Sequence, residues 1–185
     1  FGIDAFHGSA LGNHGVVIAD ISEIQARKPN PKVRVLGSLF WKDGAEAQLA
    51  RLVKIAGRPY LITTDEFGAQ ASPHQSCAQG TNPYGFVHIV DIADERHPKL
   101  AGTAQLEVND PANCATVLAE QTAALSLMYS SHYCSPDDPE NTNVIACTWI
   151  SSGVRLFDVR DPAHPREIAY YNAPAFDGSK PGVFY

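Results

Sequence analysis

Alternating apolar and polar residues recur along this chain in three similar phrases. The phrases GVVIADI, FVHIVDI and GVRLFDV end at Ile21, Ile92 and Val159. Each phrase is followed by a polar turn that ends in proline and then by a second apolar run. The two-residue period and the β-branched and aromatic content predict a strand on each side of the turn, so each copy is an antiparallel hairpin.

Two further hairpins precede the second and third phrases. ARLVKIAGRPYLITTD turns at Gly57 to Pro59, and SSHYCSPDDPENTNVIACTW turns near Pro139 to Thr142. Each complete unit therefore has four antiparallel strands, and such a unit repeated in series is the blade of a β-propeller. The sequence predicts an all-β fold in a single domain, residues 1–185, with about ten to twelve strands. The units span about residues 1–41 (a partial one), 50–108 and 128–174.

The repeated phrases resemble those of known families. GFVHIVDIADERHPKLAG and GVRLFDVRDPAHPREIAYY look like LVIVD repeats, the blade units of bacterial and archaeal β-propellers, many of them predicted to be exported or on the cell surface. CTWISSGVRLFDVRDPAHPREIAYY is also similar to the last blades of selenium-binding proteins, some of which are copper-dependent methanethiol oxidases. The first resemblance implies a β-propeller outside the cytoplasm and indicates no activity, so we expect a non-catalytic scaffold that binds through its loops. The second resemblance implies a copper-dependent oxidase as the alternative.

Two complete units and part of a third cannot close a ring, because a propeller has at least four blades. An open arc exposes sheet faces and unpaired strand edges to water. We therefore expect these residues to be part of a larger propeller, whose remaining edge meets more chain or another copy of itself.

The long insertions are expected at one end of the sheets. The segment FHGSALGNHG, residues 68–83 and residues 109–127 emerge on the same face of the blades, and binding residues gather on such loops. The link at 109–127 holds the one expected helix, over residues 113–126, with Asn113 as its N-cap. The partner expected at this face is a protein or a glycan.

Three histidines on this face are candidate metal ligands, namely His7, His14 and His74. Imidazoles that converge could bind copper or zinc. Alternatively they are separate solvated loop residues, because they come from different units. His132 lies in an inner strand and is expected to be a hydrogen-bonded core residue. Surface or turn positions are expected for His88, His97 and His164.

The aspartates Asp20, Asp91 and Asp158 stand where a strand ends and a turn begins. A carboxylate at that position normally accepts backbone N–H groups, so a structural role is expected rather than a cation site. The turn DDPENTN could recruit calcium, but it lacks the oxygen spacing and glycine of a calcium loop and is expected to be solvated. Its acidic residues are Asp137, Asp138 and Glu140. Core positions between blades are expected for Trp41, Trp149, Phe157, Tyr170 and Tyr171.

The four cysteines predict disulfides rather than a zinc site, because the chain has no C-x-x-C. Antiparallel pairing sets Cys134 opposite Cys147, and the two long loops on one face hold Cys77 and Cys114. Cys114 with Cys134 or Cys147 remains the rival pairing. Disulfides persist in oxidising compartments, so a periplasmic, cell-surface or secreted location is expected.

Composition and motifs narrow the function classes. The net charge is −6, and the 14 basic residues are scattered, which argues against a nucleic-acid surface. No apolar run approaches the roughly 20 residues that span a bilayer. The chain has no P-loop, G-x-G-x-x-G, G-x-S-x-G or H-E-x-x-H, so no motif indicates an enzyme.

Overall fold

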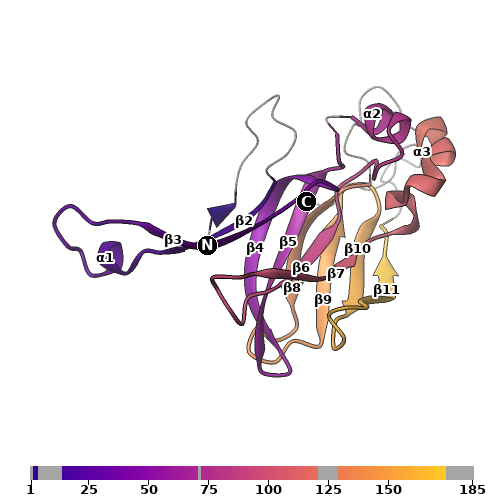
Figure 1. Ribbon diagram of the computed structural model, residues 1–185. Coiled ribbons are helices and arrows are strands. Elements are labelled where there is room, and N and C mark those ends of the chain that lie inside the picture. Colours follow the sequence, from indigo (N-terminus) through magenta and orange to yellow (C-terminus); the bar gives the residue numbers. More distant parts are fainter. Residues whose placement is uncertain (1, 4–13, 71, 121–128, 174–185) are drawn as a thin grey trace.

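The computed structural model describes residues 2–3, 14–70, 72–120 and 129–173, whose strands form three antiparallel sheets (Figure 1). The first sheet has the order β1-β2-β3, with bounds Gly2–Ile3, His14–Asp20 and Arg34–Trp41. The second has the order β4-β5-β6-β7, with bounds Ala45–Ile55, Arg58–Phe67, Val87–Asp91 and Lys99–Ala104. The third has the order β8-β9-β10-β11, with bounds Ser131–Pro136, Val144–Trp149, Gly153–Asp158 and Arg166–Tyr171.

Every strand pairs with its neighbour in the sequence, so each four-stranded sheet is a meander. The predicted all-β fold and the predicted four-stranded antiparallel units are thereby confirmed. Within the parts of the chain that the structure describes, the sheets do not close into a ring. The closed propeller and its completion by more chain or another copy stay predictions.

Short helices lie in the connections, with the bounds Ser22–Gln25 (α1), Pro73–Ala78 (α2), Glu107–Asn109 (η1), Pro111–Asn113 (η2) and Cys114–Glu120 (α3). α3 confirms the helix predicted in the link before the third unit, while residues 121–126 lie outside the described residues. The expected N-cap was wrong, because Asn113 belongs to the preceding 3-10 turn, which Asp110 caps through the Ala112 N–H. α2, which the sequence did not predict, begins after Ser72, whose hydroxyl accepts the Gln75 N–H.

Two of the three clusters of buried residues lie on either side of the second sheet. Ile62 and Ile89 pack toward the third sheet with Trp149 and Phe157, while Leu61 on the neighbouring position packs toward the first sheet. Successive side chains of a strand point to opposite faces, so β5 and β6 are buried on both. The second sheet is therefore the middle layer of the described structure.

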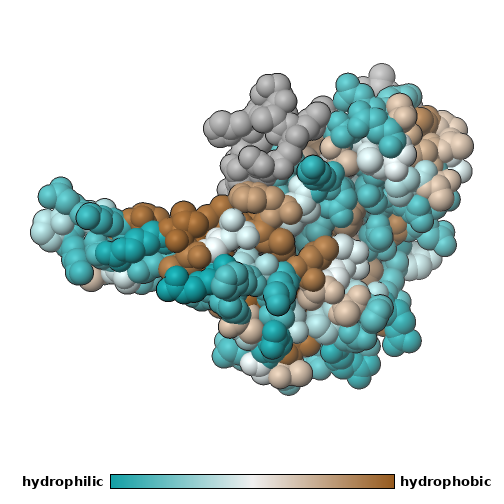
Figure 2. Space-filling view, viewed as in Figure 1, coloured by the Kyte–Doolittle hydropathy of each residue, from teal (hydrophilic) through white to brown (hydrophobic). Residues whose placement is uncertain are grey.

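The predicted aromatic core is only partly correct. Trp41, Trp149 and Phe157 are buried, whereas Tyr170 and Tyr171 are 68% and 61% exposed. Both tyrosines belong to β11, which pairs with β10 alone among the described strands. Apolar side chains are also exposed elsewhere. Figure 2 shows an apolar area along the arm formed by β2 and β3, where Val33, Val35 and Phe40 are exposed.

Two glycines bring neighbouring units into backbone contact. A Cβ atom placed on Gly37 of β3 would lie 2.3 Å from the Glu95 carbonyl oxygen, and one on Gly102 of β7 would lie 2.3 Å from the Pro162 carbonyl oxygen. Glu95 and Pro162 each belong to the turn of the following repeat. Each glycine pairs with the residue two positions before the repeated aspartate of its hairpin. The same close backbone contact, which we call the glycine joint, therefore occurs twice.

We predict that Gly102→Ala lowers the free energy of unfolding by about 1–3 kcal/mol, because the new methyl group displaces the turn at Pro162. The matched control is Ala169→Gly, at the same register position in the third hairpin and on the exposed strand β11. Its cost should be about 0.5–1 kcal/mol, that of a glycine inside a strand. Urea unfolding measures both variants, and equal losses would contradict the close joint.

Candidate functional site

The three repeated aspartates are turn residues. Asp20, Asp91 and Asp158 each accept the backbone N–H two residues later, over 2.8, 3.0 and 3.1 Å. Each also contacts an arginine guanidinium. The pKa of Asp158 lies far below its ordinary value, chiefly because the Arg160 side chain donates hydrogen bonds to its carboxylate. The expected structural role of these carboxylates is confirmed.

The exposed turns at the same end of the sheets also follow the prediction. His97 and His164 are largely exposed, and each contacts the aspartate three residues earlier. In the acidic turn, Asp137 Oδ1 accepts the N–H groups of Asn143 and Val144, and Glu140 is 74% exposed. The Asp137 carboxylate organises the backbone of this turn, and Glu140 forms an ion pair with Lys54.

A histidine in the middle layer lies between two carboxylates. His88 Nε2 is 3.0 Å from Asp43 Oδ1, and Nδ1 is 3.2 Å from Asp65 Oδ2. The second contact is an ion pair without hydrogen-bond geometry. Trp41 stacks on the imidazole at 4.3 Å between ring centroids and donates its indole N–H to Asp65 Oδ2 over 2.7 Å. His88 and Asp65 have fully buried side chains.

The surface or turn position expected for His88 is therefore wrong. His88 is buried because β6 is covered on both faces, so a polar residue in the alternating pattern is buried like its neighbours. The imidazole tolerates this position because it meets a carboxylate at each ring nitrogen. Neither carboxylate is close to His88 in the sequence.

The two carboxylates raise the pKa of His88 to about 9. Burial is the largest single influence and lowers this pKa, but the contacts with Asp43 and Asp65 together outweigh it. For the acid Asp65, in contrast, burial raises the pKa. Partial burial raises the pKa of Asp43, but the hydrogen bond and the charge of His88 hold it below its ordinary value. At neutral pH His88 is an imidazolium that connects three segments of the chain.

A second polar group joins β2, β4, β5 and β8. Gln48 donates to Glu66 Oε2 over 2.5 Å, and His132 Nε2 lies 3.4 Å from Glu66 Oε1. Burial and the charge of Glu66 raise the pKa of Glu46, and His14 opposes that shift. His14 is 7% exposed, and neither of its ring nitrogens has a hydrogen-bond partner among the described residues. The sequence predicts that His132 is a hydrogen-bonded core residue of an inner strand. Its side chain is 13% exposed, and its strand β8 is at the edge of the third sheet among the described strands.

The three candidate metal ligands are not brought together in the described structure. His7 lies outside the described residues, His14 is buried in β2, and His74 is exposed in α2. Within the described ranges no three His, Cys, Asp or Glu side chains form a group that could hold a metal ion. These side chains do not fit a copper or zinc centre as they stand, and the predicted metal site stays a prediction.

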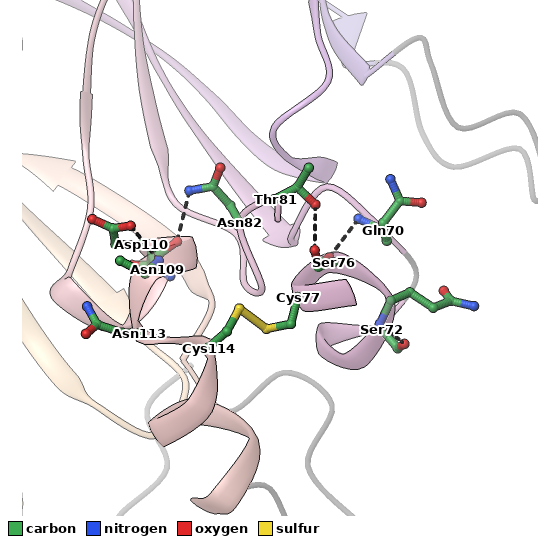
Figure 3. Close-up of a disulfide and its surroundings, with 12 residues drawn as sticks. Gln70, Ser72, Ser76, Cys77, Thr81, Asn82, Asn109, Asp110, Asn113 and Cys114 are labelled. Carbon is green, nitrogen blue, oxygen red and sulfur yellow. Dashed lines mark hydrogen bonds between the residues drawn. A yellow bond between two sulfur atoms is a disulfide. The ribbon is translucent and has the colours of Figure 1, made fainter. Parts of the chain in front are cut away.

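Both predicted disulfides form. Cys77–Cys114 joins α2 to α3, and Cys134–Cys147 joins the paired strands β8 and β9 (Figure 3 shows the first). We call residues 72–80 and 107–120, which hold α2, η1, η2, α3 and the first disulfide, the platform. It lies at one end of the sheets, on the connections β5–β6 and β7–β8 (Figure 1).

Side-chain amides and hydroxyls hold the platform together. Ser76 Oγ accepts the Gln70 N–H, and Asn82 Nδ2 donates to the Asn109 carbonyl over 2.9 Å (Figure 3). The Asn109 side chain is fully buried and bridges the backbones of Leu106 and Tyr129. Sequence reasoning missed Asn109, because an asparagine in a loop gives no sign of burial. These bonds join segments that are distant in the sequence.

Comparisons with known proteins add no family assignment. No protein-family model matches the chain, and no curated protein matches it. No helix in the described part of the chain is long and apolar enough to cross a membrane.

We predict that the protein loses stability as pH rises from 6.5 to above 9. The folded pKa of His88 exceeds its unfolded value, so its contribution is complete below about pH 6.5 and disappears through about pH 9. The loss should be on the order of 3 kcal/mol in urea unfolding. His88→Gln should remove this dependence, and His97→Gln should retain it.

The imidazole C–H shifts of His88, followed by NMR across the same pH range, check the assignment without a variant. Equal alkaline losses in the wild type and in folded His88→Gln would contradict the role of the Asp43–His88–Asp65 contacts.

Proposed function

We propose that the protein is an extracytoplasmic binding scaffold that presents its platform to a protein or glycan partner. The observation that carries this proposal is the Cys77–Cys114 disulfide, which joins two insertions from successive connections of the sheets. The sheets below it have no need of these insertions for strand pairing, because every strand pairs with its sequence neighbour. A tied pair of insertions on a rigid support is a typical arrangement for recognition.

Rigidity favours binding because less conformational entropy is lost when a partner is bound. The disulfide closes a segment of 37 residues. The Leu106–Asn109 bond fixes the backbone within it, and the Gln70–Ser76 bond fixes the backbone just before it. Two disulfides and no free cysteine among the described residues support an oxidising compartment. The LVIVD resemblance points to the same location, outside the cytoplasm.

An array of purified cell-wall polysaccharides, glycans and secreted proteins tests the proposal. We predict that the wild type is retained on at least one component and that Cys77→Ser/Cys114→Ser weakens retention tenfold or more, about 1.4 kcal/mol. The matched control is Cys134→Ala/Cys147→Ala, which leaves the platform disulfide in place and should retain binding where circular dichroism shows it folded. Absence of retention, or equal loss in both folded variants, would contradict the platform as the binding face.

A copper-dependent oxidase is the second candidate, favoured by one observation. His14 is buried where its charge acts on Glu46, and it has two ring nitrogens without hydrogen-bond partners among the described residues. A buried polar group without a partner is costly, so a ligand at this position would explain it. The oxidase ranks second because the described residues supply no set of three metal ligands.

Metal analysis after incubation with Cu(II) separates the two candidates. On the oxidase alternative, the wild type should hold copper stoichiometrically, and His14→Ala should lose it. The control His97→Ala removes an exposed turn imidazole and should bind copper as the wild type does. Absence of copper in the loaded wild type removes the oxidase alternative.

A further inference from the structure

An open cavity of about 660 Å³ borders the platform. It lies between η1, the turn that joins β9 to β10, and the exposed strand β11. The β9–β10 turn is at the same end of the sheets as α2 and α3, where it forms the arch at the top of the third sheet (Figure 1). The volume is within the range of small-ligand sites, roughly 300–1,000 Å³.

A fixed guanidinium and an aromatic ring form one wall of the cavity. Arg155 Nε donates to the Ser152 carbonyl over 2.8 Å, and its Nη1 donates to Glu167 Oε1 over 3.0 Å. The guanidinium carbon lies 4.8 Å from the centroid of the Tyr170 ring. Three contacts therefore hold Arg155 in place, while the Tyr170 side chain remains 68% exposed. A ligand would meet groups that are already ordered.

Two further polar groups border the same space. Ser151 is 6% exposed, and its hydroxyl is buried without a hydrogen-bond partner among the described residues. Glu107 of η1 also lines the cavity. A buried hydroxyl without a partner costs free energy, so Ser151 favours a ligand that supplies a donor or an acceptor.

The composition of the wall selects among ligand classes. Glu107 and Glu167 exceed Arg155 by one negative charge, which disfavours an anion. An organic cation would compete with Arg155 for the Tyr170 ring. A neutral sugar has hydroxyls that both donate and accept, matching the carboxylates, guanidinium and serine, and a C–H face that packs on an aromatic ring.

We propose that this cavity binds a neutral saccharide, with one sugar ring against Tyr170 and its hydroxyls on Arg155, Glu107 and Ser151. The inference rests on the proposed function, because it gives the binding face a ligand class. It adds the β9–β10 turn and β11 to that face. Of these residues the sequence pattern indicated only Tyr170, and as a core residue rather than a ligand contact.

Saturation-transfer NMR with maltotriose, cellotriose and chitotriose as probes tests the inference. At least one should bind the wild-type protein, and Tyr170→Ala and Arg155→Gln should each weaken binding tenfold or more. The matched control is Tyr171→Ala, which removes an equally exposed ring from the opposite side of β11 and should change binding less than twofold. Thermal unfolding confirms that each variant is folded.

Several outcomes would overturn the saccharide site. They are failure of all three probes, preferential binding of choline or of an acidic oligosaccharide, and equal losses in folded Tyr170→Ala and Tyr171→Ala. The array distinguishes this failure from failure of the scaffold itself. Platform-dependent retention on secreted proteins alone rejects the saccharide site and leaves the scaffold proposal, whereas retention on nothing rejects both.

Discussion

The buried carboxylate of Asp65 is the constraint on which the arrangement of the three sheets depends. Its Oδ2 accepts the Trp41 indole N–H and lies beside His88, while its backbone carbonyl accepts the Ser131 hydroxyl over 3.1 Å. A Cβ atom on Gly85 would lie 1.9 Å from that carbonyl, so only glycine allows the approach. An unpaired buried carboxylate is costly, so the Asp65 side chain favours the packing of the first sheet, through Trp41, on the second, through His88. The third sheet meets the same residue through its backbone carbonyl.

The features that sequence predicted are those fixed by neighbouring residues. Strand alternation, the proline turns and the repeated aspartates are local, and the register of one hairpin was enough to place Cys134 opposite Cys147. The positions of His88 and Asn109 depend on partners brought together only by packing: Asp43 is 45 residues from His88. The exposure of Tyr170 likewise depends on what lies beside β11, which alternation within the strand does not encode.

The two ends of the sheets differ in the length and content of their connections. At one end, short turns hold their shape through Asp91 and Asp158, and the glycine joints pack one unit against the next. At the other end, the connections are long and carry a disulfide, a buried asparagine and an open cavity. Side chains can change at that end without disturbing strand register, because the register is set by the turns and the cross-strand pairs.

The glycine joints also limit how many times the same contact can be used. Gly37 and Gly102 leave room for the backbone of the following repeat's turn. At the corresponding place in the third hairpin the chain has Ala169, paired with Leu156, and its methyl group occupies that room. A fourth copy of the phrase could not seat its turn on β11 as the second and third copies seat theirs. An element that packed on β11 would have to approach it with a different geometry from the one that the two glycines allow.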